Sequence, residues 1–183
     1  MDGKAAMGRS VLKWELIGIA VISVLGSVMH FAFALSGNSP AVGVFAAVNE
    51  SVFEHLKLTY WPTVVYAAFT YGFLRKSTSN FIIAKTAGIY VMPLAIIMLF
   101  YSYKGVTGIE SLAADIVIFV VAIALGQLTS YRILKASPLP PSLKWVALAF
   151  LVALGVIYGV FTFYTPHIPL FMESTSGTYG IPR

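Results

Sequence analysis

Long apolar segments recur along the chain, and they constrain its fold more than any other feature of the sequence. A helix needs about 20 mostly apolar residues to cross a membrane. Hydrophobic residues make up 58% of the 183 residues and charged residues 10%, whereas soluble domains contain roughly 45–50% and 25%. A soluble domain of this length cannot bury so much apolar surface. The composition therefore excludes a soluble enzyme, a nucleic-acid-binding protein and a disordered chain, and it predicts a lipid bilayer as the environment.

These segments predict an all-α, polytopic membrane protein with five transmembrane helices in one domain over residues 1–183. The expected spans cover residues 14–35, 60–74, 81–101, 109–134 and 143–164. Residues 41–58 begin apolar and then carry Glu50, Glu54 and His55, which cannot face lipid at mid-bilayer. We expect this stretch to form a re-entrant or interfacial amphipathic helix. The tail over residues 165–183 contains three prolines and two glycines and is expected to be extended.

The basic residues divide unequally between the two sides of this topology. Nine of the twelve fall on the side of the N-terminus: Lys4, Arg9, Lys13, Arg75, Lys76, Lys85, Arg132, Lys135 and Lys144. The other three are Lys57, Lys104 and Arg183. Cytoplasmic loops carry an excess of Lys and Arg, so we expect a cell-membrane protein with a cytoplasmic N-terminus and an extracytoplasmic C-terminus. Glu15 is expected to form an interfacial ion pair with its neighbour Lys13.

Histidines and acidic residues gather on the outer side of this topology. All three histidines and five of the seven acidic residues lie there: His30, His55, His167, Glu50, Glu54, Glu110, Asp115 and Glu173. They come from separate segments, so their convergence on one side is the main functional signal of the sequence. Asp115 lies inside an expected span, where a carboxylate is costly and is a functional candidate by default.

The stretch before the second span favours metal binding. One face of a helix over residues 46–58 would carry Glu50, Ser51, Glu54 and His55. Two carboxylates four residues apart repel unless a metal ion, a shared proton or a basic side chain lies between them. Histidine and carboxylate ligands without thiolate suit zinc, manganese or iron, and the chain has no cysteine. We expect a divalent metal, with zinc the leading candidate, on ligands drawn from His30, His55, His167 and Glu50.

Residues 37–40 and 49–58 resemble the signature of an uncharacterised family of small multi-pass membrane proteins of bacteria and archaea. The second stretch reads NESVFEHLKL. Further similar stretches are residues 14–18, 30–31, 166–171 and 177–181, so the resemblance covers nearly the whole chain. The family is known as a domain of unknown function. The resemblance therefore supports the location of the site and implies no chemistry.

The chain is also loosely similar to the membrane hydrolases that include alkaline ceramidases. That resemblance implies a zinc ion held by three histidines, with a serine and an aspartate nearby. Ser51 and His55 are spaced like the serine–histidine pair of that class, and His30, His167 and Asp115 would complete the set. Those enzymes have seven spans and a His-x-x-x-His pair, and this chain has neither.

Three functions fit these observations. The first is a metal-dependent hydrolase of an amphiphilic substrate, in which Asp115 or Glu54 deprotonates a metal-bound water and Ser51 is a further catalytic candidate. The second is a cation or proton transporter that uses Glu50, Glu54 and Asp115, with a homodimer continuing the polar path. The third is a non-catalytic membrane scaffold.

Overall fold

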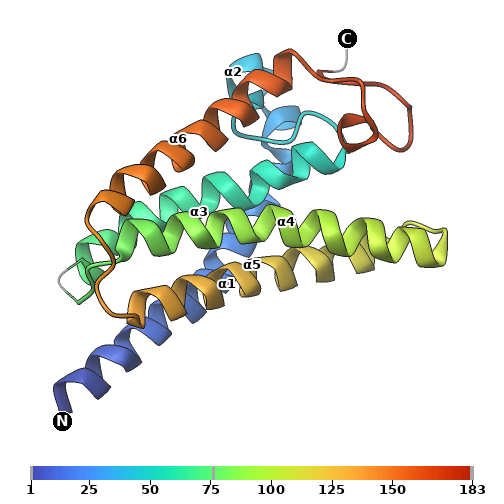
Figure 1. The fold of residues 1–183 in the computed structure, drawn as a ribbon. Helices are drawn as coiled ribbons and strands as arrows, with labels where there is room; N and C mark the ends of the chain where they lie inside the picture. The colour runs from blue at the N-terminus through green and yellow to red at the C-terminus, as the bar shows by residue number, and fades with distance from the viewer. Residues whose placement is uncertain (1, 76, 182–183) are drawn as a thin grey trace.

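The computed structural model describes residues 2–75 and 77–181, whose long helices form one elongated bundle (Figure 1). The elements are α1 (Asp2–Leu35), α2 (Pro40–Gly43), α3 (Val52–Leu74), α4 (Phe81–Thr107), α5 (Leu112–Lys135), α6 (Ser142–Phe163) and the 3₁₀ helix η1 (Pro169–Phe171). The two termini lie at opposite ends of the bundle in Figure 1. Residues 1, 76 and 182–183 lie outside the described part of the chain. Two of the basic residues counted in the charge distribution, Lys76 and Arg183, are among them.

Among the described residues, four helices are long and apolar enough to cross a membrane. They are α1 over Gly8–Leu35, and α4, α5 and α6 over their whole lengths. They coincide with the expected spans 14–35, 81–101, 109–134 and 143–164. The membrane environment and the all-helical fold of the described residues are therefore confirmed, and of the five expected spans these four have the required length and composition.

The expected helix over residues 41–58 is not a separate element. Part of it forms the short α2, residues 44–51 form an irregular loop, and α3 continues without a break into the expected span 60–74. The helix begins where it does because Ser51 is its N-cap and accepts a hydrogen bond from the Glu54 amide at 3.4 Å. A serine followed three residues later by a glutamate is the signature of a capping box, so this start is visible in the sequence.

α3 is more polar than the four spanning helices because much of its surface is buried against the rest of the bundle. Twelve of its 23 residues are buried. The hydroxyls of Thr59, Thr63 and Thr70 donate to carbonyls of the same helix, at 2.8 Å to Leu56, 2.6 Å to Thr59 and 2.9 Å to Tyr66. These internal bonds satisfy the hydroxyls without water. A helix that is packed inside the bundle in this way does not need the apolar composition of a helix that faces lipid.

A buried ion pair joins α1 to α4. The Lys85 ammonium lies 2.6 Å from a carboxylate oxygen of Glu15, and both side chains are at most 4% exposed. The expected pairing of Glu15 with Lys13 is therefore wrong, because Glu15 faces the bundle interior rather than the interface. Gln127 of α5 donates to the Glu15 carbonyl at 3.2 Å, a polar contact between helices of the kind that joins helices in membrane proteins.

The C-terminal tail (residues 164–181) folds back over the end of the bundle where α1 ends and α3 begins (Figure 1). Phe171 is 4% exposed, and its ring centroid lies 4.3 Å from that of Phe53 in α3. Met172 and Tyr179 form an isolated antiparallel bridge. The tail is therefore a packed hairpin rather than the extended segment that its prolines and glycines predict.

Candidate metal centre

Three helices approach one another closely at Gly26 of α1. A Cβ atom at this glycine would lie 2.5 Å from the Leu58 carbonyl oxygen of α3 and 2.7 Å from the Phe119 ring of α5. One helical turn from these contacts, toward the tail, lie His30 on α1, His55 on α3 and Asp115 on α5. The close packing at Gly26 therefore brings three polar side chains from three helices to one level of the bundle.

Glu50 reaches the site from the loop before α3 and not from the helix itself. Because α3 begins at Val52, the expected helical face shared by Glu50 and Glu54 does not form. The loop is held by Asn49, whose side-chain oxygen accepts from the Ser51 amide at 2.9 Å. Asn49 was not among the expected site residues. An asparagine that bonds the backbone two residues on is a common turn former, so its position before the N-cap is the signal that points to it.

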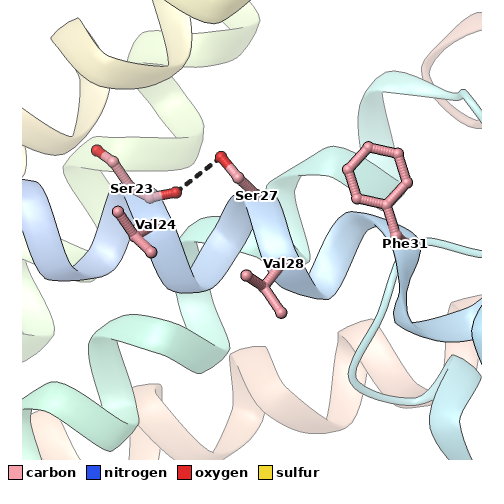
Figure 2. Close-up of a pocket in the computed structure, with 5 residues that line it drawn as sticks. All are labelled: Ser23, Val24, Ser27, Val28 and Phe31. Carbon is pink, nitrogen blue, oxygen red and sulfur yellow. Dashed lines mark hydrogen bonds between the residues drawn. The ribbon is translucent and has the colours of Figure 1, made fainter.

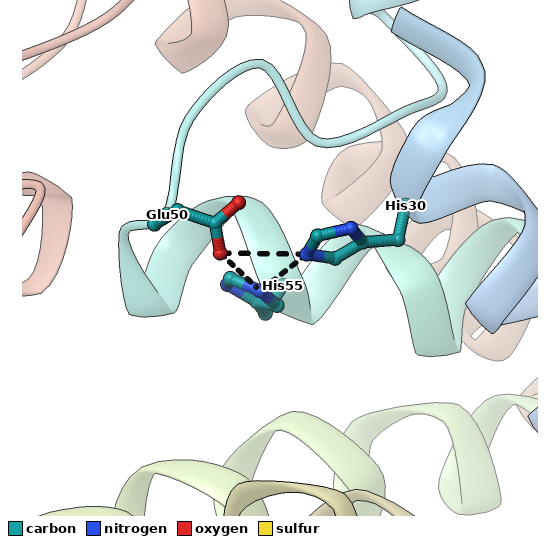
Figure 3. A group of neighbouring side chains, drawn as sticks. All are labelled: His30, Glu50 and His55. Carbon is teal, nitrogen blue, oxygen red and sulfur yellow. Dashed lines mark hydrogen bonds and ion pairs between the residues drawn. The ribbon is translucent and has the colours of Figure 1, made fainter. Parts of the chain in front are cut away.

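His30, Glu50 and His55 bring three ligand atoms to one point (Figure 3). The two Nε2 atoms lie 3.2 Å apart, and the Glu50 Oε2 atom lies 3.4 Å from each of them. A tetrahedral zinc ion with bonds of about 2.0–2.1 Å separates its ligand atoms by about 3.3–3.4 Å. The three atoms therefore form a triangle with the size of one face of a tetrahedral zinc site.

Hydrogen bonds around the triangle orient His55 and Glu50, whereas the buried Nδ1 atom of His30 has no hydrogen-bond partner among the described residues. The Nδ1 atom of His55 lies 2.8 Å from the Ser51 carbonyl, so Nδ1 carries a proton, and Nε2 offers its lone pair to a metal once the imidazole is neutral. Metal-bound histidines commonly donate in this way to a backbone carbonyl. Hydrogen bonds from His30, and then from His55, hold the pKa of the Glu50 carboxyl well below its usual range. Glu50 thus remains an ionised acceptor.

The site is accessible from outside the bundle. The side chains of His30, His55 and Glu50 are 27%, 32% and 53% exposed. A triangle of ligands with one open side is the arrangement of a catalytic metal site, which has three protein ligands and keeps a position for water or substrate.

Asp115 lies in the first turn of α5, because that helix begins at Leu112. The sequence placed it deeper in an apolar span. Its Oδ1 atom is shielded from solvent and has no hydrogen-bond partner among the described residues. The carboxylate is within electrostatic range of His55. Asp115 is not part of the group formed by His30, Glu50 and His55, so the structure places it near the site and not among the ligand atoms.

Glu54 lies beneath the loop and away from the triangle of ligands. Its carboxylate pairs with Lys57 at 2.5 Å and accepts from the Val48 amide at 3.0 Å. Lys57 also donates to the Gly43 carbonyl at 2.7 Å and to the Thr162 hydroxyl at 2.9 Å. Both charged side chains are almost completely buried. A basic side chain beside these carboxylates was one of the alternatives that the sequence left open, and for Glu54 that side chain is Lys57.

His167 lies in the tail and is not part of the group formed by His30, Glu50 and His55. Its ring stacks on that of Tyr179 with centroids 4.6 Å apart. The two rings line a polar pocket of about 380 Å³ together with residues of the tail and the end of α6. The structure therefore brings two of the three histidines together and leaves the third apart.

A shallow and open apolar groove, lined by residues of α1 alone, runs along that helix beside the site (Figure 2). It is lined by Ser23, Val24, Ser27, Val28 and Phe31. The Phe31 ring lies edge-on to the His30 ring with centroids 4.9 Å apart. The groove thus ends beside one of the histidines.

Comparison with known proteins identifies the family of this chain. No curated protein and no solved structure gave a significant match. The sequence pattern of a family of unknown function (DUF6512) matches residues 4–181. The match covers nearly the whole chain, including the segments that carry His30, Glu50 and His55. The chain therefore belongs to this family of unknown function.

Proposed function

We propose that His30, Glu50 and His55 bind a divalent transition metal. The observation that carries this proposal is the triangle of ligand atoms, with sides of 3.2, 3.4 and 3.4 Å. Two imidazoles and one carboxylate form the ligand set of many hydrolytic zinc sites and of non-haem iron sites. The triangle is closer to tetrahedral than to octahedral spacing, because octahedral ligands at about 2.1 Å lie only about 3.0 Å apart. This favours zinc over iron and manganese.

The protein would then act as a metal-dependent hydrolase. Zinc lowers the pKa of a bound water to about 7. Asp115 is the group best placed to take the proton from that water, because its Oδ1 atom is unpaired and the carboxylate is within electrostatic range of His55. Glu54 is engaged by Lys57, so we assign it a supporting role in holding the loop. Ser51 likewise holds His55 through its carbonyl.

An amphiphilic substrate fits this site best. α1 is apolar enough to cross a membrane, and the groove along it is lined mainly by Val24, Val28 and Phe31. A hydrocarbon chain in this groove would place an adjoining ester or amide beside His30. The polar head would extend toward Glu50, the most exposed of the three ligands.

Hydrolysis of acyl esters by the zinc-loaded protein in mild detergent tests this function. We expect turnover that a chelator abolishes and zinc restores. Asp115→Asn should lower kcat by about 10²–10⁴-fold, the usual contribution of a general base, and should leave bound zinc unchanged. His167→Ala is the matched control and should keep both zinc and turnover. Zinc binding without turnover on short-chain or long-chain esters would overturn the hydrolase and keep the metal site.

Proton or cation transport is the second candidate, and the buried Glu15–Lys85 pair favours it. Ionisable groups inside a membrane bundle commonly mark ion pathways, and Glu15 has a buried carboxylate oxygen without a partner among the described residues. Ion flux in liposomes that Glu15→Gln abolishes would support this function. A wild-type protein that shows no flux above empty liposomes would contradict it.

A further inference from the structure

The loop that presents Glu50 lies between α3 on one side and the tail on the other. From α3, the Glu54 carboxylate accepts from the Val48 amide at 3.0 Å. From the tail, the Gly180 carbonyl accepts from the Asn49 side-chain amide at 2.8 Å. The Glu173 carboxylate accepts from the Glu50 amide at 3.4 Å. The tail therefore bonds to Glu50 itself and to the residue before it.

The tail has a defined conformation of its own. The Glu173 amide donates to the Thr178 carbonyl at 3.0 Å, and the Gly177 amide donates to the Glu173 carbonyl at 2.9 Å. Gly180 has a φ of +70°, and a Cβ there would lie 2.8 Å from the Thr165 hydroxyl. Only glycine fits such a position without strain. The Gly180 carbonyl, which accepts the hydrogen bond from the Asn49 side chain, is thus positioned by the tail and not by the loop.

Asn49 uses both ends of its amide in this arrangement. Its oxygen accepts from the Ser51 amide at 2.9 Å, and its nitrogen donates to Gly180. Asn49 is 8% exposed, so neither bond competes freely with water. The residues on both sides of Glu50 are therefore held by one side chain. Half-exposed glutamates otherwise sample several rotamers, and ordering one of them as a ligand has an entropic cost.

We infer that the tail is coupled to the proposed metal site, with Asn49 and Glu173 acting as positioning residues for Glu50. This inference rests on the proposed function. Residues that hydrogen-bond to a metal ligand without touching the metal typically contribute about 10–100-fold to metal affinity. The coupling is reciprocal. If the folded tail raises metal affinity by a given factor, bound metal must raise the equilibrium constant for folding of the tail by the same factor.

Zinc affinity and the absorption spectrum of the Co²⁺-loaded protein test the positioning role. Asn49→Asp keeps the acceptor for the Ser51 amide and removes the donor to Gly180, so zinc should bind about tenfold more weakly or worse. The Co²⁺ spectrum should change as the carboxylate ligand is lost. Asn38→Asp is the matched control, since Asn38 is an exposed loop residue outside the site and tolerates a φ of 60°. It should leave affinity and spectrum unchanged.

Hydrogen exchange of the wild-type protein and of Asn49→Asp tests the reciprocal effect. Zinc should slow amide exchange in residues 172–181, and Asn49→Asp should remove that protection. Zinc binding with unchanged tail exchange, together with wild-type affinity in Asn49→Asp, would overturn the coupling and leave the metal site intact. A wild-type protein that binds neither zinc nor Co²⁺ would overturn the proposed function and this inference together.

Discussion

The Nε2 atoms of His30 and His55 lie 3.2 Å apart, although 25 residues separate the two histidines in the chain. One belongs to α1 and the other to the first turns of α3, and the packing at Gly26 brings the two helices together. Two neutral imidazoles cannot both direct lone pairs at one point without a proton or a cation between them. The proposed metal site depends on that relationship.

Zinc affinity should fall as the pH is lowered through the pKa of His55, which burial lowers but hydrogen bonds to the Glu50 carboxylate and the Ser51 carbonyl raise above its ordinary value overall. A metal competes with protons for its ligands, and both imidazoles must be neutral to bind. Glu50 releases no proton there, because its pKa is held below the usual carboxyl range. Competition titrations between about pH 5.5 and 8 should show that zinc binding releases protons from the protein. Affinity that does not depend on pH over this range would contradict the two-histidine site.

Breaking the buried Glu54–Lys57 pair should destabilise the fold. Lys57→Met leaves a buried carboxylate without its cation, which costs about 3–5 kcal/mol in comparable sites. The double variant Glu54→Gln with Lys57→Met removes both charges and should recover much of that loss. Denaturant unfolding in detergent micelles measures both. A double variant as unstable as Lys57→Met would show that the uncompensated charge is not the cause.

A methyl group at Gly26 should separate the two histidines. Gly26→Ala places a Cβ atom against the α3 backbone at Leu58, so α1 must move outward, at a cost of about 1–3 kcal/mol. Zinc affinity should fall as well. The matched control is Gly72→Ala in α3, where a Cβ atom meets nothing within 4 Å. That change should be neutral or stabilise by up to about 1 kcal/mol. Equal effects at the two glycines would contradict the packing argument.

Single cysteines test the expected orientation, because the natural chain has none. If α3 crosses the membrane as the fifth span, the two ends of the chain lie on opposite sides. A membrane-impermeant maleimide should then label Thr175→Cys in intact cells and label Ser10→Cys only after the membrane is permeabilised. Both positions are exposed. Labelling of both positions from outside would contradict an odd number of spans.

The sequence predicted the helices that face lipid more reliably than it predicted the helix inside the bundle. Apolar runs mark four spanning helices because lipid selects an apolar surface over their whole length. α3 carries buried threonines and a buried ion pair, so its composition does not distinguish a membrane span from an interfacial helix. The capping pattern at Ser51 was the better indication of where it begins.

Site residues were predictable by type and by the end of the bundle at which they gather, but their partners were not. His30, Glu50 and His55 were among the candidates, and the structure places their ligand atoms together. Glu54 is bound by Lys57 and His167 stacks on Tyr179, contacts that depend on how the loop and tail fold. Asn49 escaped notice because its role lies in a bond to Gly180, 131 residues away in the chain.

The metal content of the purified protein tests the central claim most directly. The protein would be purified in mild detergent without chelator, and bound metals measured by elemental mass spectrometry. We expect about one zinc ion per chain in the wild type and in His167→Ala, and none in His55→Ala or Glu50→Ala. No bound metal in the wild type, or a metal retained in His55→Ala and lost in His167→Ala, would contradict that claim.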